Sequence, residues 1–314
     1  AAEVAFKKFR IPHPRVTEVA QQLEILRTVG RETRREWIEG GRRGQRPEQK
    51  FLPIFAESGS GKSTAIRSYM ETTVAAEGHP DTVRPVIHVS LSENANTASA
   101  AGDILEELDD PDWEEGTGRK RIKRVAALLD GLDSEAVVID EMQHLIHRDT
   151  GEKTARSVRD MLKRMLIRGT TPLVFVGTLD AEPVIFGDNQ MKNRAMPPVY
   201  MPPLDDRDPD ERRMWLEHCA GFDIELVRHG IFEDHSNLAF GDVPANAMEI
   251  AKGVIGTASR LFEVAATSAM VRGAKHIEWD DLDAAVETWA IPLKLVSENP
   301  FRRGTSTLKR KKGA

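Results

Sequence analysis

The chain has 314 residues, of which 40% are hydrophobic and 30% charged, and its formal net charge is −6. This length predicts about two domains, or one large domain with a smaller appendage, of ordinary globular composition. No apolar run reaches the roughly 18 residues of a membrane span and no signal-peptide pattern opens the chain, so we expect a cytoplasmic protein without a membrane partner. The single cysteine, Cys219, lacks Cys or His neighbours at metal-ligand spacing and is interpreted as a core thiol.

The first 50 residues predict an arm followed by one or two helices. Residues 6–14 are basic and broken by prolines, which predicts an extended arm. Apolar residues recur at near-helical intervals from Val16 to Trp37, with Thr17 as the expected cap and Gly30 as a weak point. Residues 40–47 form a basic Gly/Arg-rich loop, whose charge we attribute to solvation and which leads to the first strand.

The stretch from residue 51 to residue 64 predicts a phosphate-binding loop, the Walker A motif. Gly61, Lys62 and Ser63 match the end of the pattern G-x-x-x-x-G-K-[ST], and Ala56 stands where the first glycine belongs. An apolar run suited to a buried strand precedes the loop and a helical pattern follows it, which is the context that the motif requires. A simple Gly/Ser-rich turn is the alternative, but such a turn has no need of a lysine at this position.

These residues would bind ATP with Mg²⁺. Backbone N–H groups of the loop can surround phosphate oxygens, and the positive end of the following helix favours the same charge. Lys62 would reach the β- and γ-phosphates, and the Ser63 hydroxyl would ligate Mg²⁺. The N-terminal arm could pack against the nucleotide base. The predicted ATP-binding residues are Glu57, Ser58, Gly59, Ser60, Gly61, Lys62, Ser63, Thr64, Ile11 and His13.

Residues 135–141 form an apolar run that ends in two carboxylates, which is the form of a Walker B segment. Asp140 can hold Mg²⁺ beside Ser63, while Glu141 can orient or deprotonate the attacking water. A strand with an acidic end and no catalytic role is the alternative. Gln143 or His144 could report on the γ-phosphate, or either residue could serve packing alone.

Further strands and helices predict the rest of an α/β sheet. Residues 85–90, 171–178 and 198–201 suit buried strands separated by helices, so a parallel sheet should bind its ligand beyond the strands' carboxyl ends. Thr178 would be the sensor of the γ-phosphate, or it could cap the next turn. Arg194 lies just before the last strand, where it could reach a neighbouring subunit's nucleotide.

From residue 205 the pattern becomes helical and predicts a small lid. Arg260 lies on the first turn of one lid helix and could fold over the γ-phosphate, although a surface arginine is the alternative. The tail is polar and basic, and we expect it not to fold by itself. The expected domains are an arm with helices at 1–50, the α/β core at 51–204, the lid at 205–296 and the basic tail at 297–314.

In this order, the phosphate loop, the acidic strand end, Thr178, Arg194 and the Arg260 helix resemble an AAA+ ATPase with a central five-stranded parallel sheet. The chain is also similar to one branch, the TniB/TnsC family of transposition regulators. That similarity rests on residues 10–15, 140–145, 176–178 and 299–301 and spans nearly the whole chain. The chain departs from the family at Ala56 and at Arg194, which lacks the aromatic residue that commonly follows the finger arginine.

The resemblance implies an ATPase with slow, regulatory hydrolysis that binds duplex DNA as an oligomeric ring or filament in the bacterial cytoplasm. It also implies recruitment of a target-selection protein of the TniQ type and transfer of the site to a DDE transposase. The family's DNA contacts lie in the insert after the second strand, where this chain places a basic cluster behind an acidic, turn-rich segment. The DNA-binding residues implied are Thr117, Arg119, Lys120, Arg121 and Lys123.

Two other functions use the same motifs. A replication-type loader or initiator has the same ATPase core, but such proteins often carry a winged helix after the lid, where this sequence shows only a short basic tail. A small-molecule kinase also combines a phosphate loop with a mobile lid, and Glu141 and Arg260 speak against that reading. We therefore place the transposition regulator first, the loader second and the kinase third.

Overall fold

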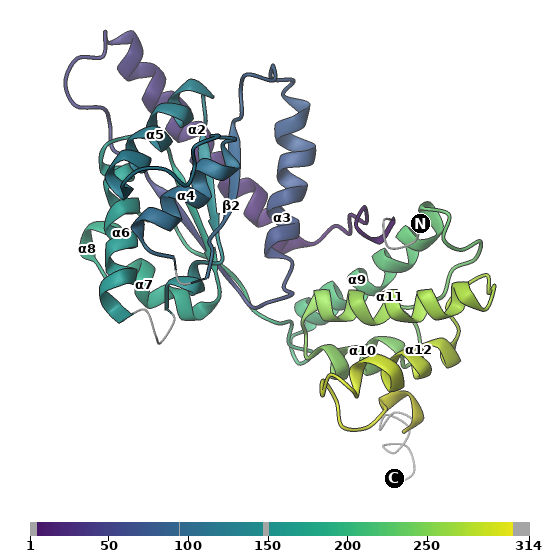
Figure 1. The fold of residues 1–314 in the computed structure, drawn as a ribbon. Coiled ribbons are helices and arrows are strands. Elements are labelled where there is room, and N and C mark those ends of the chain that lie inside the picture. Colours follow the sequence, from purple (N-terminus) through teal and green to yellow (C-terminus); the bar gives the residue numbers. More distant parts are fainter. Residues whose placement is uncertain (1–4, 94, 147–150, 304–314) are drawn as a thin grey trace. The chain divides into compact units, whose positions relative to one another are not determined.

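The computed structural model describes residues 5–93, 95–146 and 151–303 (Figure 1). These residues fall into two compact units. The α/β unit comprises residues 15–58 and 62–201, and the helical unit comprises residues 5–14, 59–61 and 202–303. Among the described residues, no helix combines the length and the apolarity that a membrane-spanning segment requires.

The α/β unit is built on a five-stranded sheet in which every pairing is parallel. The strands lie in the order β2-β3-β4-β1-β5, with Ile54 of β1 opposite Val176 of β4 on one side and Val199 of β5 on the other. The predicted five-stranded parallel sheet is confirmed. The strands are β1 (Phe51–Ala56), β2 (Val86–Ser90), β3 (Ala136–Asp140), β4 (Leu173–Gly177) and β5 (Val199–Met201).

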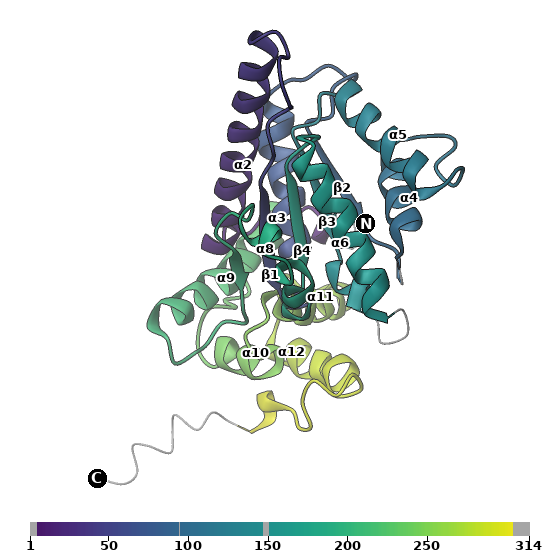
Figure 2. The same cartoon turned by 90° about the vertical axis from the view of Figure 1, so that its left-hand side faces the viewer.

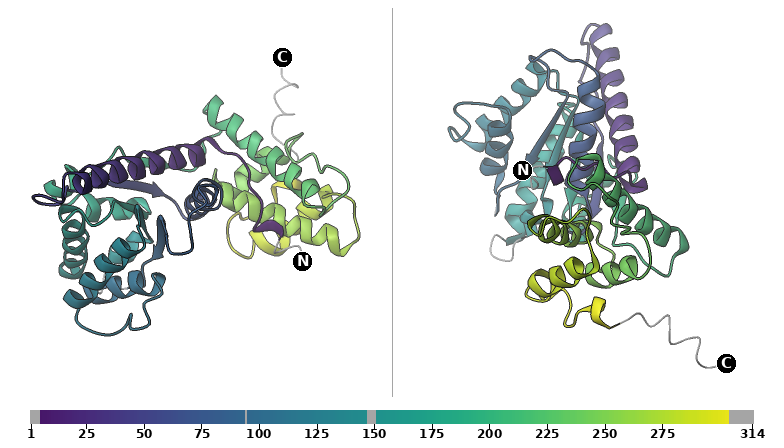
Figure 3. Two further views of the ribbon diagram at one scale, coloured as in Figure 1. Left: turned by 90° about the horizontal axis from the view of Figure 1, so that it is seen from above. Right: turned by 90° about the vertical axis from the view of Figure 1, so that its right-hand side faces the viewer.

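Helices cover both faces of this sheet, which explains why its central strands are apolar throughout. Phe51 and Phe55 point into a core shared with α4, α5 and α6, whereas Leu52 and Ile54 point into a second core shared with α2 and α3. Figures 2 and 3 show α2 along one face and the α4–α6 layer on the other. The helices are α2 (Pro14–Glu39), α3 (Lys62–Tyr69), α4 (Thr97–Glu107), α5 (Gly118–Gly131), α6 (Gly151–Ile167), α7 (Glu182–Phe186) and α8 (Asn189–Lys192), with the shorter turns η1 (Met70–Val74), η2 (Met142–Ile146) and η3 (Leu179–Ala181).

Helix α2 agrees with the expectation of one or two helices and differs only in where it begins, which is before the expected cap Thr17. It is a single helix that begins at Pro14, a residue tolerated at a first helical position because its missing N–H needs no partner there. Gly30 lies within the helix and serves a close contact, since a Cβ at this position would come 2.4 Å from Cγ of Pro172. Glycine therefore allows α2 to approach the start of β4.

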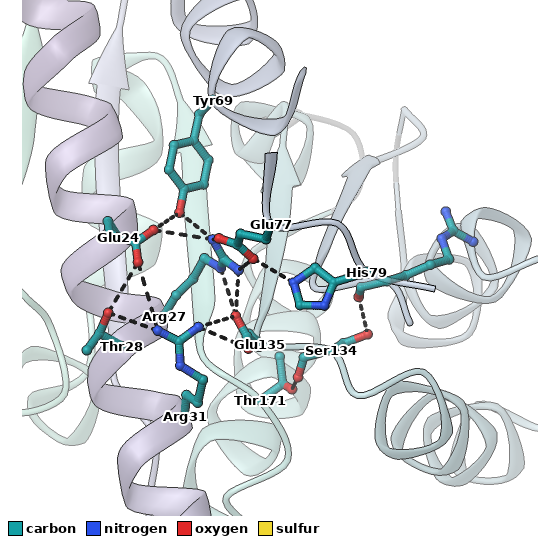
Figure 4. Close-up of polar contacts among 11 residues, drawn as sticks. Glu24, Arg27, Thr28, Arg31, Tyr69, Glu77, His79, Ser134, Glu135 and Thr171 are labelled. Carbon is teal, nitrogen blue, oxygen red and sulfur yellow. Dashed lines mark hydrogen bonds and ion pairs between the residues drawn. The ribbon is translucent and has the colours of Figure 1, made fainter. Parts of the chain in front are cut away.

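A buried ion cluster joins α2 to α3 and to the residue before β3 (Figure 4). The Arg27 side chain is fully buried and donates to the Tyr69 hydroxyl at 2.7 Å, to Glu77 at 2.8 Å and to Glu135 at 2.6 Å. The hydrogen bond from Arg27 outweighs the opposing effect of burial and lowers the pKa of Glu77 to about 2. The cluster keeps a buried guanidinium fully paired, which is the condition under which such a charge is tolerated.

The helical unit has its own core, formed by Trp215, Phe222 and Phe262 among others. Cys219 is buried there, and burial raises the pKa of its thiol to about 12, which agrees with the predicted core thiol. Asp208 caps the first helix through the N–H groups of residues 210 and 211. The elements are α9 (Pro209–Arg228), α10 (Val243–Ala251), α11 (Ile255–Val271), α12 (Trp279–Ala285), η4 (Val286–Ala290) and η5 (Pro300–Arg302).

Both ends of the described chain contribute to this helical core. The ring of Phe9 in the N-terminal arm meets the ring of Phe222 edge-on, with the ring centroids 5.2 Å apart. Phe301 is buried and lies 5.0 Å from the Trp279 ring, so the first residues of the predicted basic tail are packed. Residues 304–314 of that tail lie outside the described residues.

Candidate ATP site

Three sequence-predicted segments meet the same edge of the sheet. The phosphate loop follows β1, Asp140 ends β3 and Thr178 follows β4. Because β1, β3 and β4 are parallel and β4 lies between the other two, their carboxyl ends open onto one edge, where ligands bind in open α/β sheets.

The loop after β1 has the backbone of an anion cradle. Gly59 and Gly61 have φ values of +81° and +88°, a left-handed conformation that glycine adopts without the steric cost that a Cβ adds. Lys62, the first residue of α3, is only 7% exposed, and its ammonium group has no polar partner among the described residues. The buried Ser60 hydroxyl also lacks a partner within the described chain. An unpaired buried cation is costly, so this loop fits an anionic ligand such as a phosphate.

Ser63 and Asp140 form the candidate magnesium site. Ser63 Oγ donates to Asp140 Oδ2 at 3.0 Å, and His88 Nε2 on β2 approaches the same oxygen at 3.2 Å. Burial tends to raise the pKa of Asp140, but hydrogen bonds from His88, the Glu141 N–H and Ser63 together hold it below its ordinary value. A hydroxyl beside an ionised carboxylate is an oxygen ligand set that suits Mg²⁺, whose remaining positions are filled by water and phosphate.

Glu141 follows Asp140 in a strained conformation, with φ of +61° although it is not a glycine. Its N–H donates to Asp140 Oδ1 at 2.8 Å, so Glu141 contributes one of the hydrogen bonds that Asp140 accepts. Gln143 Nε2 donates to the Glu141 carboxylate, and Gln143 Oε1 accepts from the Thr178 N–H at 3.1 Å. The Thr178 hydroxyl is buried and has no hydrogen-bond partner in the described structure.

Arg194 lies between α8 and β5 and is engaged within its own chain. It pairs with Glu48 at 2.6 Å and donates to the Gln190 carbonyl at 2.6 Å. Glu48 is half exposed, so this ion pair lies at the surface. Arg194 would have to leave Glu48 to act on a neighbouring subunit.

Ile11, His13 and Arg260 lie in the helical unit, and the contacts described for them are made within that unit. Ile11 packs against α9, where a Cβ at Gly221 would come 2.6 Å from Ile11 Cγ2. His13 is buried. Arg260 has a side chain that is 54% exposed and pairs with Glu263 at 2.8 Å along α11.

The predicted DNA-binding residues lie at the start of α5. Thr117 is the N-cap residue, and Arg119, Lys120 and Lys123 are exposed and have no ion pair among the described residues. Arg121 differs, because its guanidinium donates to the carbonyls of Ala98, Gly116 and Glu114. Three unpaired cations at the positive end of a helix are unfavourable in isolation, which suits an anionic partner.

Comparison with known families decides the affiliation of the chain. The sequence model of the family described as "TniB: Bacterial TniB protein" matches residues 11–203, which is more than half of the chain. The chain belongs to the TniB family. None of the curated proteins matches this TniB-family chain in a sequence search.

Solved structures resemble the TniB-family chain in fold. Cdc6p from Pyrobaculum aerophilum has a TM-score of 0.60 and 18% identity, over 91% of this chain and 70% of that chain. The Aeropyrum pernix ORC2 protein in ADPNP-ADP complexes has a TM-score of 0.58 and 15% identity, over 90% and 70% of the two chains. The Aeropyrum pernix ORC1 protein in complex with DNA has a TM-score of 0.53 and 17% identity, over 84% and 64%. These similarities confirm the AAA+ fold.

Two residues of the TniB-family site were missed or left open by the sequence. His88 was included in an apolar strand without a role, and the signal available was a polar side chain in an otherwise buried run. For Gln143 the sequence is compatible with two roles, a reporter of the γ-phosphate and a packing residue. The structure places His88 against Asp140 and Gln143 between Glu141 and Thr178.

Proposed function

We propose that this TniB-family chain binds and hydrolyses ATP with Mg²⁺ and, in the ATP state, assembles on duplex DNA as a regulator of transposition. The observation that carries the proposal is the constellation at the carboxyl edge of the sheet. An unpartnered buried lysine, a serine bonded to an ionised aspartate, and a second carboxylate one residue further along are the groups that phosphoryl transfer to water needs.

Each group has one role in this proposal. The loop N–H groups and Lys62 bind the phosphates, while Ser63 and Asp140 hold Mg²⁺, which when bound neutralises charge on the β- and γ-phosphates. Glu141 accepts the proton of the attacking water. The free Thr178 hydroxyl donates to the γ-phosphate or to that water, since no group of the described chain uses it.

The remaining groups come from a neighbouring subunit, from the N-terminal arm and from the lid. Arg194 acts in trans on the nucleotide of a neighbouring subunit, once it has left Glu48. Ile11 and His13 contact the base, and Arg260 reaches the γ-phosphate from the lid. Hydrolysis is then slow in the isolated chain and depends on assembly as a ring or filament.

The DNA surface is proposed at the start of α5. Arg119, Lys120 and Lys123 contact phosphates, because these cations have no ion pairs within the described chain, and Thr117 contributes its hydroxyl beside them. Arg121 shapes the preceding loop through its three carbonyl contacts. Such contacts are blind to sequence, so target choice comes from a partner of the TniQ type before the site passes to a DDE transposase. These steps place the protein on DNA in the bacterial cytoplasm.

A loader or initiator is the second candidate function. It is favoured by the structural similarity to proteins named Cdc6p, ORC1 and ORC2, one of which is in complex with DNA. At 15 to 18% identity this similarity concerns the fold. Membership of the TniB family favours the transposition regulator.

Electron microscopy with duplex DNA tests the proposal. With a non-hydrolysable ATP analogue we expect rings or helical filaments on the DNA, and with ADP or with Lys62→Ala we expect none. Nucleotide binding without any DNA-dependent assembly would reject the assembly role. Single, separate assemblies on the DNA that load a hexameric helicase would favour the loader.

A further inference from the structure

We propose that Gln143 is a positioning residue that ties the Glu141 carboxylate to the carboxyl end of β4. The inference rests on the proposed ATPase function and adds a residue to its site. Gln143 lies in η2, directly after the acidic strand end, and its side-chain amide touches both Glu141 and the backbone of Thr178.

The two contacts fix the orientation of the Gln143 amide. The Thr178 N–H is a donor, so the amide atom that faces it at 3.1 Å must be the carbonyl oxygen. The NH₂ group then faces Glu141 Oε2. An ionised carboxylate has no hydrogen to donate, so this oxygen is an acceptor. A flipped amide would oppose a donor to a donor and an acceptor to an acceptor.

The backbone around Gln143 is shaped for this bridge. A Cβ at Gly177, the last residue of β4, would come 3.0 Å from Gln143 Oε1, so a side chain there would press on the amide. Glu141 takes a left-handed conformation that non-glycine residues rarely adopt. This turn leaves Asp140 bonded to Ser63 while the Glu141 carboxylate meets Gln143.

The bridge makes the base and the sensor one unit. Thr178 is held by its N–H, while its hydroxyl has no partner in the described chain. A shift of the β4 end therefore moves Glu141 as well. Without the bridge, Glu141 gains rotamer freedom and spends less time where it can take a proton from water, so kcat falls while ATP binding is kept.

Two substitutions separate this role from simple packing. Gln143→Glu has nearly the same shape and still accepts from the Thr178 N–H, but it presents a carboxylate instead of a donor to Glu141. Gln143→Ala removes both contacts. Gln45→Glu is the matched control, because Gln45 is exposed in the basic loop and the charge change is the same.

We expect Gln143→Glu and Gln143→Ala to lower kcat by about tenfold or more. The loss should not exceed the factor of about 10² to 10⁴ that a general base contributes. KM for ATP should change less than about threefold. The control should hydrolyse ATP as wild type does. Amide hydrogen exchange at Thr178 in the nucleotide-free protein should be faster in Gln143→Ala and unchanged in Gln143→Glu.

Several results would overturn the inference. A wild-type kcat in Gln143→Glu, or a faster one, would show that the contact with Glu141 does not position the base. Unchanged exchange at Thr178 in Gln143→Ala would show that the other half of the bridge is not formed. If the wild-type protein fails to hydrolyse ATP on DNA, the proposed function fails and this inference falls with it, whereas the first two results leave the ATPase function standing.

Discussion

Ser63 and Asp140, 77 residues apart in the chain, meet at 3.0 Å through Ser63 Oγ and Asp140 Oδ2. Ser63 is the second residue of α3, the helix after the phosphate loop, and Asp140 ends β3. Their contact brings the two halves of the candidate magnesium site together. The site is therefore preorganised, since the carboxylate is already ionised and directed at the hydroxyl.

Lys62→Ala and Glu141→Gln should have different effects. Removing Lys62 takes away the cation proposed to bind the phosphates, so nucleotide binding should be lost. Glu141→Gln keeps the shape but removes the base, so ATP should still bind while turnover stops. Equilibrium binding of a fluorescent ATP analogue and phosphate release measure the two properties. Equal loss of affinity in both variants would contradict the roles assigned.

The Arg194 hypothesis predicts rescue between two inactive subunits. A finger in trans contributes roughly 10³ to 10⁵ in rate, so Arg194→Ala should abolish assembly-dependent hydrolysis. Mixed with Lys62→Ala subunits, it should regain part of the activity at interfaces that combine an intact loop with an intact arginine. Light scattering must confirm that the two variants co-assemble. Co-assembly without any recovery would show that Arg194 acts elsewhere, for example in its ion pair with Glu48.

The DNA surface that we propose at the start of α5 leads to a prediction about salt dependence. Each phosphate that a cation neutralises contributes about 0.9 to the slope of log affinity against log salt. Lys120→Ala with Lys123→Ala should therefore weaken DNA binding and flatten this slope, while ATP binding is kept.

The matched control for the DNA surface is Arg42→Ala with Arg43→Ala, two exposed cations of the basic loop that have no ion pairs among the described residues. This variant should bind DNA as wild type does. If the control weakens binding and the α5 variant does not, the DNA surface lies elsewhere. Candidates are then residues 153–164 or the tail at 302–312, most of which lies outside the described residues.

The ion cluster predicts a large loss of stability in Arg27→Met. This change leaves Glu77 and Glu135 without their buried partner, and breaking a buried pair costs about 3 to 5 kcal/mol. Arg31→Met is the control, because Arg31 is 41% exposed and surface pairs contribute about 1 kcal/mol or less. Urea unfolding measures both. Similar free energies of unfolding for the two variants would contradict the role of Arg27.

The burial of His218 leads us to expect that acid lowers the stability of the helical unit. Burial first, and the nearby His13 second, lower the pKa of His218 from 6.5 to about 4. The unfolded chain therefore binds a proton more readily between these values, so the free energy of unfolding should fall as the pH drops from about 6.5 to about 4. His218→Gln, which can still bond the Ser259 hydroxyl, should flatten this dependence in unfolding followed by tryptophan fluorescence. An unchanged pH dependence would exclude His218 as its source.

The sequence by itself determined the parts of the protein that depend on neighbouring residues. The strand, loop and helix around Lys62 follow from an apolar run, two glycines with left-handed backbones and a helical pattern, all within one short segment. The acidic end of β3 and the five strands of the sheet were likewise predicted, because a strand buried on both faces needs a continuous apolar run. For the same reason the candidate phosphate and magnesium residues could be named in advance.

Only the tertiary structure decided which distant side chains meet. Arg27 bonds Glu135 across 108 residues, and His88 reaches Asp140 across 52. Gln143 contacts Thr178 across 35 residues, although the local sequence pattern shows Gln143 only as a residue of a short turn. No local periodicity encodes these contacts, since they depend on strand order and on the direction of each side chain once the sheet has formed. The sequence thus located the candidate phosphate-binding groups, whereas the packed fold showed which side chains contact them.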